Sequence, residues 1–195
     1  MARLSRLLIL VILVSWSSSL AQEATPALSV TPFASFEQFD SHSRLNAGFG
    51  LGAALSYAFS PGVVLGLEAH MGNADEEFDV VGGTSTMTVH HATYMLTFDY
   101  RFFSSSSLAD VYATAGVGMF RLSTDERQIS RGALGHVSIP GTAETRGAYS
   151  LGLVLSRSVS SRIAIRLEPR VVLLAPLSEH ESNYLITGGI TFVVL

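Results

Sequence analysis

Two residues in the second half of the chain, His136 and Ser138, have types and spacing that could do chemistry, and Glu144 follows them. A serine becomes a nucleophile when a histidine lies within hydrogen-bond reach and a carboxylate orients that histidine. The three residues could therefore form a hydrolytic triad. His136 and Ser138 fall, however, in a segment that contains glycines and Pro140, which predicts a loop and not a rigid strand. We therefore predict no catalytic residue, and we expect that the chain is not an enzyme.

Metal and cofactor sites find even less support. His90 and His91 are neighbours, and neighbouring side chains in a strand point to opposite faces, so the pair cannot form one metal site by itself. The chain has no cysteine, no Cys/His spacing of the zinc type and no glycine-rich phosphate loop. The sequence therefore predicts no metal and no cofactor.

The elements that must position any functional side chain are strands. In the segment 45–59 every odd position is apolar or aromatic, and every even position is Gly, Ala, Ser or Asn. Successive side chains of a strand lie on opposite faces, so this segment has one apolar wall and one small, polar wall. It is also far longer than the roughly 5–6 residues of a usual strand. A long strand of this kind is typical of a transmembrane β-barrel, whose outside is lipid.

Turn signals divide the rest of the chain into similar segments. We predict eight strands, which cover residues 28–39, 45–59, 63–72, 87–103, 111–122, 142–157, 163–173 and 183–195. Long polar loops are predicted at 73–86 and 123–141, both after odd-numbered strands, whereas the connections after even-numbered strands are short. Outer-membrane barrels show this alternation of short periplasmic turns and longer extracellular loops. The predicted fold is all-β, an eight-stranded antiparallel up-and-down transmembrane β-barrel.

Seven charged residues fall on the inward parity of these strands. They are Glu68, Asp99, Arg101, Arg146, Arg166, Glu168 and Arg170. A charge that faced lipid would cost about 2–4 kcal/mol at the membrane midplane, so the parity is strongly constrained. An eight-stranded barrel is just wide enough for its own side chains, so we predict that these charges pair and plug the lumen. The alternative is a gated, porin-like ion pore lined by the same residues.

The N-terminus predicts the destination of the chain. Arg3 and Arg6 precede an apolar run at 7–16, and Ser19-Leu20-Ala21 offers a signal-peptidase site. We therefore expect a cleavable signal peptide at 1–21 and one barrel domain at 22–195. The formal net charge is −4 and there is no basic run, which excludes nucleic acid as a partner.

Three stretches resemble a known family. Residues 112–118 look like its glycine-alternating central strand, and 166–170 are similar to its inward Glu-x-Arg strand. Gly189, Phe192 and Val194 resemble its C-terminal assembly signal, although Leu195 stands last where an aromatic residue is usual. The family is that of the small outer-membrane β-barrel proteins of Gram-negative bacteria, which includes the OmpA, OmpX and OmpW types.

The resemblance implies a monomer in the outer membrane, in contact with lipid and lipopolysaccharide and assembled by the barrel-assembly machinery. Arg127 and Arg131, in the second long loop, are candidates for binding lipopolysaccharide phosphates. We expect a non-enzymatic barrel with a structural or loop-mediated binding role in the envelope. One alternative is a lipid-modifying hydrolase, because lipid A deacylases also use a His-x-Ser pair with a glutamate. The other is a soluble periplasmic ligand-binding barrel.

Overall fold

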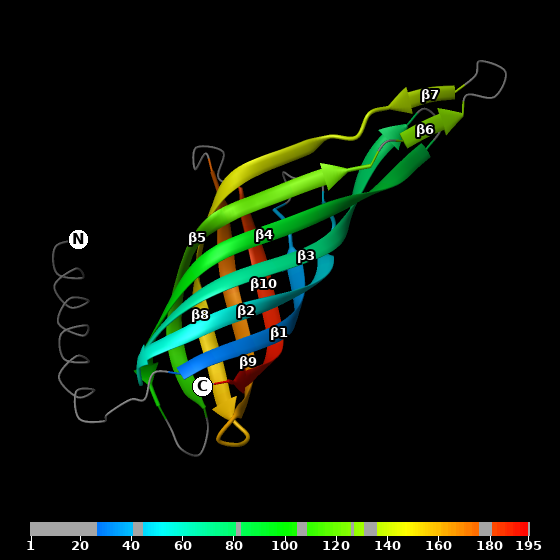
Figure 1. Cartoon of the computed structure of the whole chain (residues 1–195). Coiled ribbons are helices and arrows are strands. Elements are labelled where there is room, and N and C mark those ends of the chain that lie inside the picture. The colour runs from blue at the N-terminus through cyan, green and yellow to red at the C-terminus, as the bar shows by residue number, and fades with distance from the viewer. Residues whose placement is uncertain are drawn as a thin grey trace, which may run out of the picture.

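The computed structural model describes residues 27–40, 45–80, 83–104, 109–125, 127–130, 136–175 and 181–194 (Figure 1). The predicted signal peptide at 1–21 lies outside these residues. No helix in the described part of the chain has the length and hydropathy needed to span a membrane.

Eight antiparallel strands close into one barrel, in the order β1-β10-β9-β8-β5-β4-β3-β2. These strands are β1 (Ala27–Gln38), β2 (Gly48–Ser60), β3 (Val63–Val80), β4 (Gly83–Phe103), β5 (Asp110–Thr124), β8 (Ala143–Ser158), β9 (Ile163–Leu174) and β10 (Ser182–Val193). A separate two-stranded sheet pairs β6 (Arg127–Ser130) with β7 (His136–Ile139). The predicted eight-stranded up-and-down barrel is therefore confirmed.

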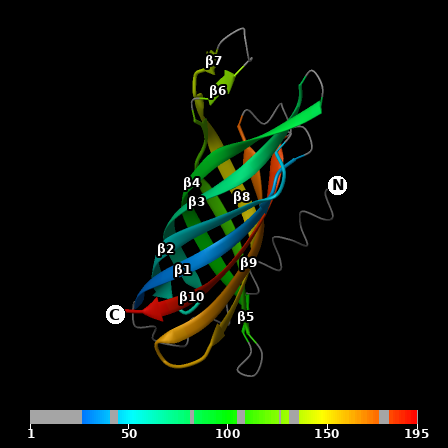
Figure 2. The ribbon, with the colours of Figure 1, turned by 90° about the vertical axis from the view of Figure 1, so that its right-hand side faces the viewer.

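The two ends of the barrel differ (Figures 1 and 2). At one end, which we call the turn end, tight turns join β2 to β3 and β8 to β9, and the C-terminus lies there. At the other end, the hairpin end, β3 and β4 continue past the neighbouring strands and the β6-β7 sheet stands beyond the rim. Long and short connections thus fall on opposite ends, as the alternation in the sequence predicts.

Six of the eight barrel strands begin and end within three residues of their predicted bounds, and the exceptions are β3 and β4. The predicted loop at 73–86 is wrong, because β3 and β4 stay paired from Val63↔Tyr100 to Val80↔Gly83. On the outward parity of β3 this segment carries Asn73 and Asp75 where a membrane strand has apolar residues, so the membrane pattern ends there. Outside the membrane a hairpin needs no apolar face, and cross-strand pairs stabilise it. One such pair is the Thr88 hydroxyl, which donates to Asp75 Oδ1 at 3.0 Å.

The second predicted loop, at 123–141, also contains regular structure. Strand β5 continues to Thr124, and β6 and β7 pair from Arg127↔Ile139 to Ser130↔His136. The same reason applies, because a polar hairpin beyond the rim carries no apolar alternation that would reveal it in the sequence.

The strands carry apolar side chains outward and polar ones inward. On β4, every second side chain from His91 to Asp99 is buried, and the side chains between them are more exposed. Large apolar side chains cover the outside, with Leu51 73 % and Leu67 60 % exposed, whereas Glu168 is 2 % exposed. This orientation argues against the soluble carrier, which requires an apolar interior and a polar exterior.

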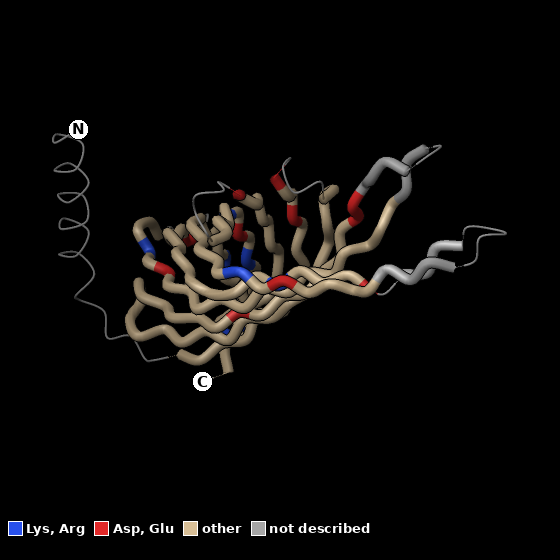
Figure 3. Tube along the Cα trace, turned by 90° about the horizontal axis from the view of Figure 1, so that it is seen from above, with Lys and Arg blue, Asp and Glu red and all other residues tan. Residues whose placement is uncertain are grey.

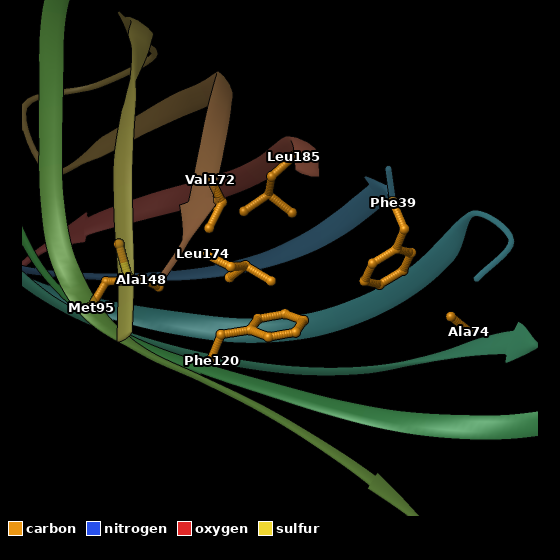
Figure 4. Packing of buried hydrophobic residues seen from close by; sticks show 8 residues of the cluster. All are labelled: Phe39, Ala74, Met95, Phe120, Ala148, Val172, Leu174 and Leu185. Atoms are coloured by element: carbon orange, nitrogen blue, oxygen red, sulfur yellow. The ribbon is translucent and has the colours of Figure 1, made fainter. Parts of the chain in front are cut away.

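The lumen is filled rather than hollow towards the hairpin end. An apolar cluster there comprises Phe39, Ala74, Met95, Phe120, Ala148, Val172, Leu174 and Leu185. Figure 4 shows Phe120, Leu174, Val172 and Leu185 directed into the same space, with Phe39 nearby. Seen from above in Figure 3, charged positions are few along the strands of the barrel. The lumen therefore holds an apolar layer in addition to its charges.

We predict that Leu67→Arg lowers the free energy of unfolding in lipid by about 2–4 kcal/mol, because the guanidinium would enter the hydrocarbon layer. Urea titration of the chain folded in lipid vesicles measures this quantity. The matched control is Thr88→Arg, which faces outward on β4 beyond the apolar band and beside Asp75. It should change the free energy of unfolding by less than about 1 kcal/mol. Equal losses from the two substitutions would contradict the lipid-facing assignment of the outer wall.

Candidate functional site in the barrel lumen

Five ionic side chains form one connected network inside the barrel. Arg166 Nη2 donates to Asp99 Oδ2 at 3.0 Å and to Glu168 Oε2 at 2.9 Å. Arg170 Nη2 lies 2.9 Å from Glu168 Oε1 and donates to Glu68 Oε2 at 2.5 Å. Glu168 therefore holds both arginines, and each arginine reaches a second carboxylate on another strand.

The strand order explains how this network crosses the lumen. Strand β9 carries three alternate inward residues, Arg166, Glu168 and Arg170, because residues two apart in a strand share a face. In the closed order β9 lies opposite β3, which carries Glu68. The pair formed by Arg170 and Glu68 thus joins opposite walls of the barrel.

Small residues give the long side chains room. Gly152 on β8 pairs with Arg170 on β9, and a Cβ built at Gly152 would lie 2.5 Å from the Arg170 Cβ. A larger residue at 152 would collide with the backbone and Cβ of Arg170, so β9 would have to shift. Gly152, on the inward face of β8, therefore serves the packing of the network.

The network is buried deeply enough for its charges to depend on one another. The side chains of Arg170 and Glu68 are 1 % and 5 % exposed. Removing one partner from such a buried pair leaves an uncompensated charge, which typically costs about 3–5 kcal/mol. The three carboxylates and two guanidinium groups of the network leave one formal negative charge in excess.

The other two residues of the predicted set lie at the rims. Arg101 is 3.6 Å from Asp110 Oδ2 near the turn end. Arg146 contacts Glu144 at 2.6 Å and Glu181 at 2.5 Å at the hairpin end. The structure thus divides the seven predicted residues into a central network of five and two separate rim pairs.

Of the three hydrolytic candidates, only Glu144 has a described side chain. The carboxylate of Glu144 is held by Arg146. The backbones of His136 and Ser138 pair in β7 with Ser130 and Gln128, and their side chains lie outside the described set.

The remaining predicted residues are placed as follows. Arg127 begins β6, but its side chain and the whole of Arg131 lie outside the described residues. On β10 and just after it, Phe192 and Val194 face outward and are 43 % and 58 % exposed. Gly189 of the same strand faces the lumen.

A second group of inward ionisable residues was missed by the sequence reasoning. It comprises Glu37 of β1, His70 of β3 and His91 of β4, all buried. Parity alone could have revealed its members, because Glu37 shares a face with Phe33 and Ser35, and His91 shares one with Thr93. What the sequence did not reveal is that the three strands bring them to one place.

Comparison with known proteins agrees with this geometry. A family model described as an outer membrane protein beta-barrel domain matches residues 7–187. Neisserial surface protein A (NspA) has a similar crystal structure, with a TM-score of 0.62 and 11 % identity over 88 % of this chain and 100 % of NspA. A major outer membrane protein from Thermus thermophilus is also similar, with a TM-score of 0.60 and 15 % identity over 88 % of this chain and 100 % of that chain. None of the curated proteins matches the sequence.

We predict that Arg170→Met lowers the free energy of unfolding by about 3–5 kcal/mol, because Glu68 and Glu168 lose a buried cation. The control is Arg101→Met at the more exposed rim pair, which should cost less than about 1 kcal/mol. Urea titrations of both variants in vesicles give the comparison. If the loss in Arg170→Met is no greater than in Arg101→Met, the central network does not stabilise the barrel.

Proposed function

The chain belongs to the family of outer membrane protein beta-barrel domains, and from this premise we propose that it is a non-enzymatic barrel with a closed lumen. Its role in the cell envelope is structural, and its extended hairpins bind envelope ligands. The signal peptide at 1–21 is cleaved during export. Insertion into the outer membrane as a monomer uses the barrel-assembly machinery, which recognises Gly189, Phe192 and Val194.

The observation that carries this proposal is the ionic network that joins opposite walls of the barrel. An ion that crossed the lumen would have to part Arg170 from Glu68 and Arg166 from Asp99. It would also have to pass the apolar cluster around Phe120 and Leu185. Separating buried opposite charges is costly, so the paired state favours a plug over the gated pore.

The state of Glu144 supports the non-enzymatic part of the proposal. A serine hydrolase needs a carboxylate that orients its histidine. The Glu144 carboxylate instead accepts a hydrogen bond from Arg146 Nε at 2.6 Å. The lipid-modifying hydrolase therefore has less support than a binding or structural role.

The outward face of β3, β4 and β5 supports a ligand in the envelope. Its residues are apolar up to Met71, Ala92 and Met119, and polar beyond them, where Asn73, His90, Arg121, Ser123 and Asp125 follow. We call these five residues the polar rim. The His90 ring is held by Asn73 Oδ1 at 2.6 Å and by Asp125 Oδ2 at 3.2 Å.

Arg121 of the polar rim is exposed and faces outward directly above the apolar band. At that height a membrane presents its charged head groups. Arginine binds phosphate through parallel N–H donors, so the phosphates of lipopolysaccharide are the fitting ligand. Arg127 and Arg131 extend the same proposal into the β6-β7 segment.

We predict that the wild-type barrel gives no steady ion conductance in a planar lipid bilayer. The multiple variant Glu68→Ala/Arg170→Ala/Phe120→Ala should give conductance steps, because it removes the pair that joins opposite walls and the largest side chain buried in the apolar cluster. Arg101→Ala should give no steady ion conductance, like the wild type. Steady conductance of the wild type would contradict the closed lumen, and correct folding of each variant is checked by its heat-modifiable mobility in electrophoresis.

We predict that Arg121→Ala weakens binding to vesicles that contain lipopolysaccharide, measured as the loss of their effect on the thermal unfolding of the barrel. Arg157→Ala is the matched control, because Arg157 is an exposed, outward arginine at the turn end. Dephosphorylated lipopolysaccharide should abolish the difference between wild type and Arg121→Ala. Equal effects of the two alanine substitutions would count against lipopolysaccharide as the ligand of the polar rim.

A further inference from the structure

Glu37, His70 and His91 converge inside the barrel from three different strands. Glu37 Oε2 lies 3.3 Å from His91 Nδ1 and 3.6 Å from His70 Nε2. The two imidazole rings face each other edge to face, with centroids 5.3 Å apart. One potential ligand atom from each residue lies within 4.8 Å of the other two.

These polar atoms are deeply buried and have no hydrogen-bond partner among the described residues. Both histidine side chains are 0 % exposed and the Glu37 side chain is 2 % exposed. Within the described residues, neither ring nitrogen of His70 or His91 makes a hydrogen bond, and neither does Glu37 Oε2. Buried polar groups in folded proteins are almost always satisfied, so three convergent side chains in this state point to a ligand.

A hydrogen bond from Asn183 fixes the orientation of the Glu37 carboxylate. Asn183 of β10, itself 2 % exposed, donates from Nδ2 to Glu37 Oε1 at 3.1 Å. The other carboxylate oxygen, Oε2, is thereby left facing the two imidazoles. Metal-binding carboxylates are commonly held in this way by a second hydrogen bond.

The surroundings make the site dry and leave room for the rings. Phe120 stacks near His91 with centroids 6.2 Å apart, and Phe39 meets its edge at 5.4 Å. Phe33 lies 6.5 Å from His70. Gly72 makes space for His91, because a Cβ there would lie 2.6 Å from His91 Nε2.

We propose that Glu37, His70 and His91 bind one Zn²⁺ ion in the lumen. Two imidazoles and a carboxylate form a ligand set that zinc uses, with one position left for a further ligand. In a tetrahedral site with bonds of about 2.0–2.1 Å, ligand atoms are roughly 3.3 Å apart, close to the two observed separations. Ca²⁺ and Mg²⁺ prefer oxygen ligands and fit this set poorly.

The charge of the lumen is consistent with a bound cation. The site contributes one carboxylate, and the central ionic network has one carboxylate in excess of its arginines. A divalent ion would balance both negative charges. It would also connect β1, at the seam where β1 meets β10, to β3 and β4.

The test uses the full chain, without a polyhistidine tag, folded in detergent, treated with a chelator and titrated with ZnCl₂. The proposal expects one zinc ion retained per chain after gel filtration, a higher thermal unfolding midpoint, and no displacement by Ca²⁺ or Mg²⁺. Zinc affinity should fall at least tenfold in Glu37→Gln, His70→Gln and His91→Gln. Asn183→Leu should weaken it by about 10–100-fold, as the loss of an orienting partner does.

The control is His90→Gln, the sequence neighbour of His91 on the opposite face, with its side chain 44 % exposed. It should retain zinc like the wild type. Absence of retained zinc in the wild type, or equal affinity in the wild type and the three ligand variants, overturns the proposal. Should the ligand variants fail to fold, the wild type loaded with Co²⁺ decides the question. A strong visible absorption of four-coordinate Co²⁺ supports the site, and the weak spectrum of six-coordinate Co²⁺ overturns it.

Discussion

The absence of water around the outer wall is the constraint on which the rest of this structure depends. In hydrocarbon every backbone N–H and C=O must be paired within the protein, which a sheet achieves only by closing on itself. The ladder from β1 through β10 does so, and no barrel strand is left with an open edge among the residues described. The same constraint sorts the side chains. Leu51 and Leu67 can face outward, whereas Glu68, one residue along from Leu67, can only face inward.

The charged groups that face the lumen must then pair with one another, and apolar side chains fill the remaining space. Arg166 and Arg170 are bound by carboxylates from three strands, so that each charge depends on residues distant in the sequence. Towards the hairpin end the lumen is filled by the apolar cluster. Beside the apolar cluster, where His91 packs against Phe39 and Phe120, the carboxylate of Glu37 and the rings of His70 and His91 are buried. The atoms of these three side chains that face one another make no hydrogen bond to the described residues. A lumen of this kind suits a protein that acts through its outer surfaces and its hairpins more than through a pore.

The sequence was sufficient for the barrel because alternation is a local signal that each strand carries on its own. The segment 45–59 shows both the apolar, lipid-facing wall and the small, polar, inward wall of a strand. The parity of the strand residues alone placed Glu168 and Asp99 inside the barrel. The predicted loop at 73–86 was wrong because a hairpin beyond the membrane has no apolar wall to mark it. The sequence could not show which charged side chains pair, because pairing depends on which strands lie opposite each other and on the stagger between them. For this reason the pairing of Arg170 with Glu68, and the meeting of Glu37 with two histidines, appeared only in the structure.

Apolar side chains of the barrel face lipid, while the lumen is packed and closed to lipid. Tryptophan quenching by brominated lipids measures this directly, in a chain whose single tryptophan, Trp16, is replaced by phenylalanine. Tryptophan is then introduced at Leu67 or Leu153 on the outer wall, or at Phe120 within the barrel. We expect strong quenching of Leu67→Trp and Leu153→Trp and weak quenching of Phe120→Trp. Strong quenching at position 120 together with weak quenching at 67 and 153 would contradict this arrangement.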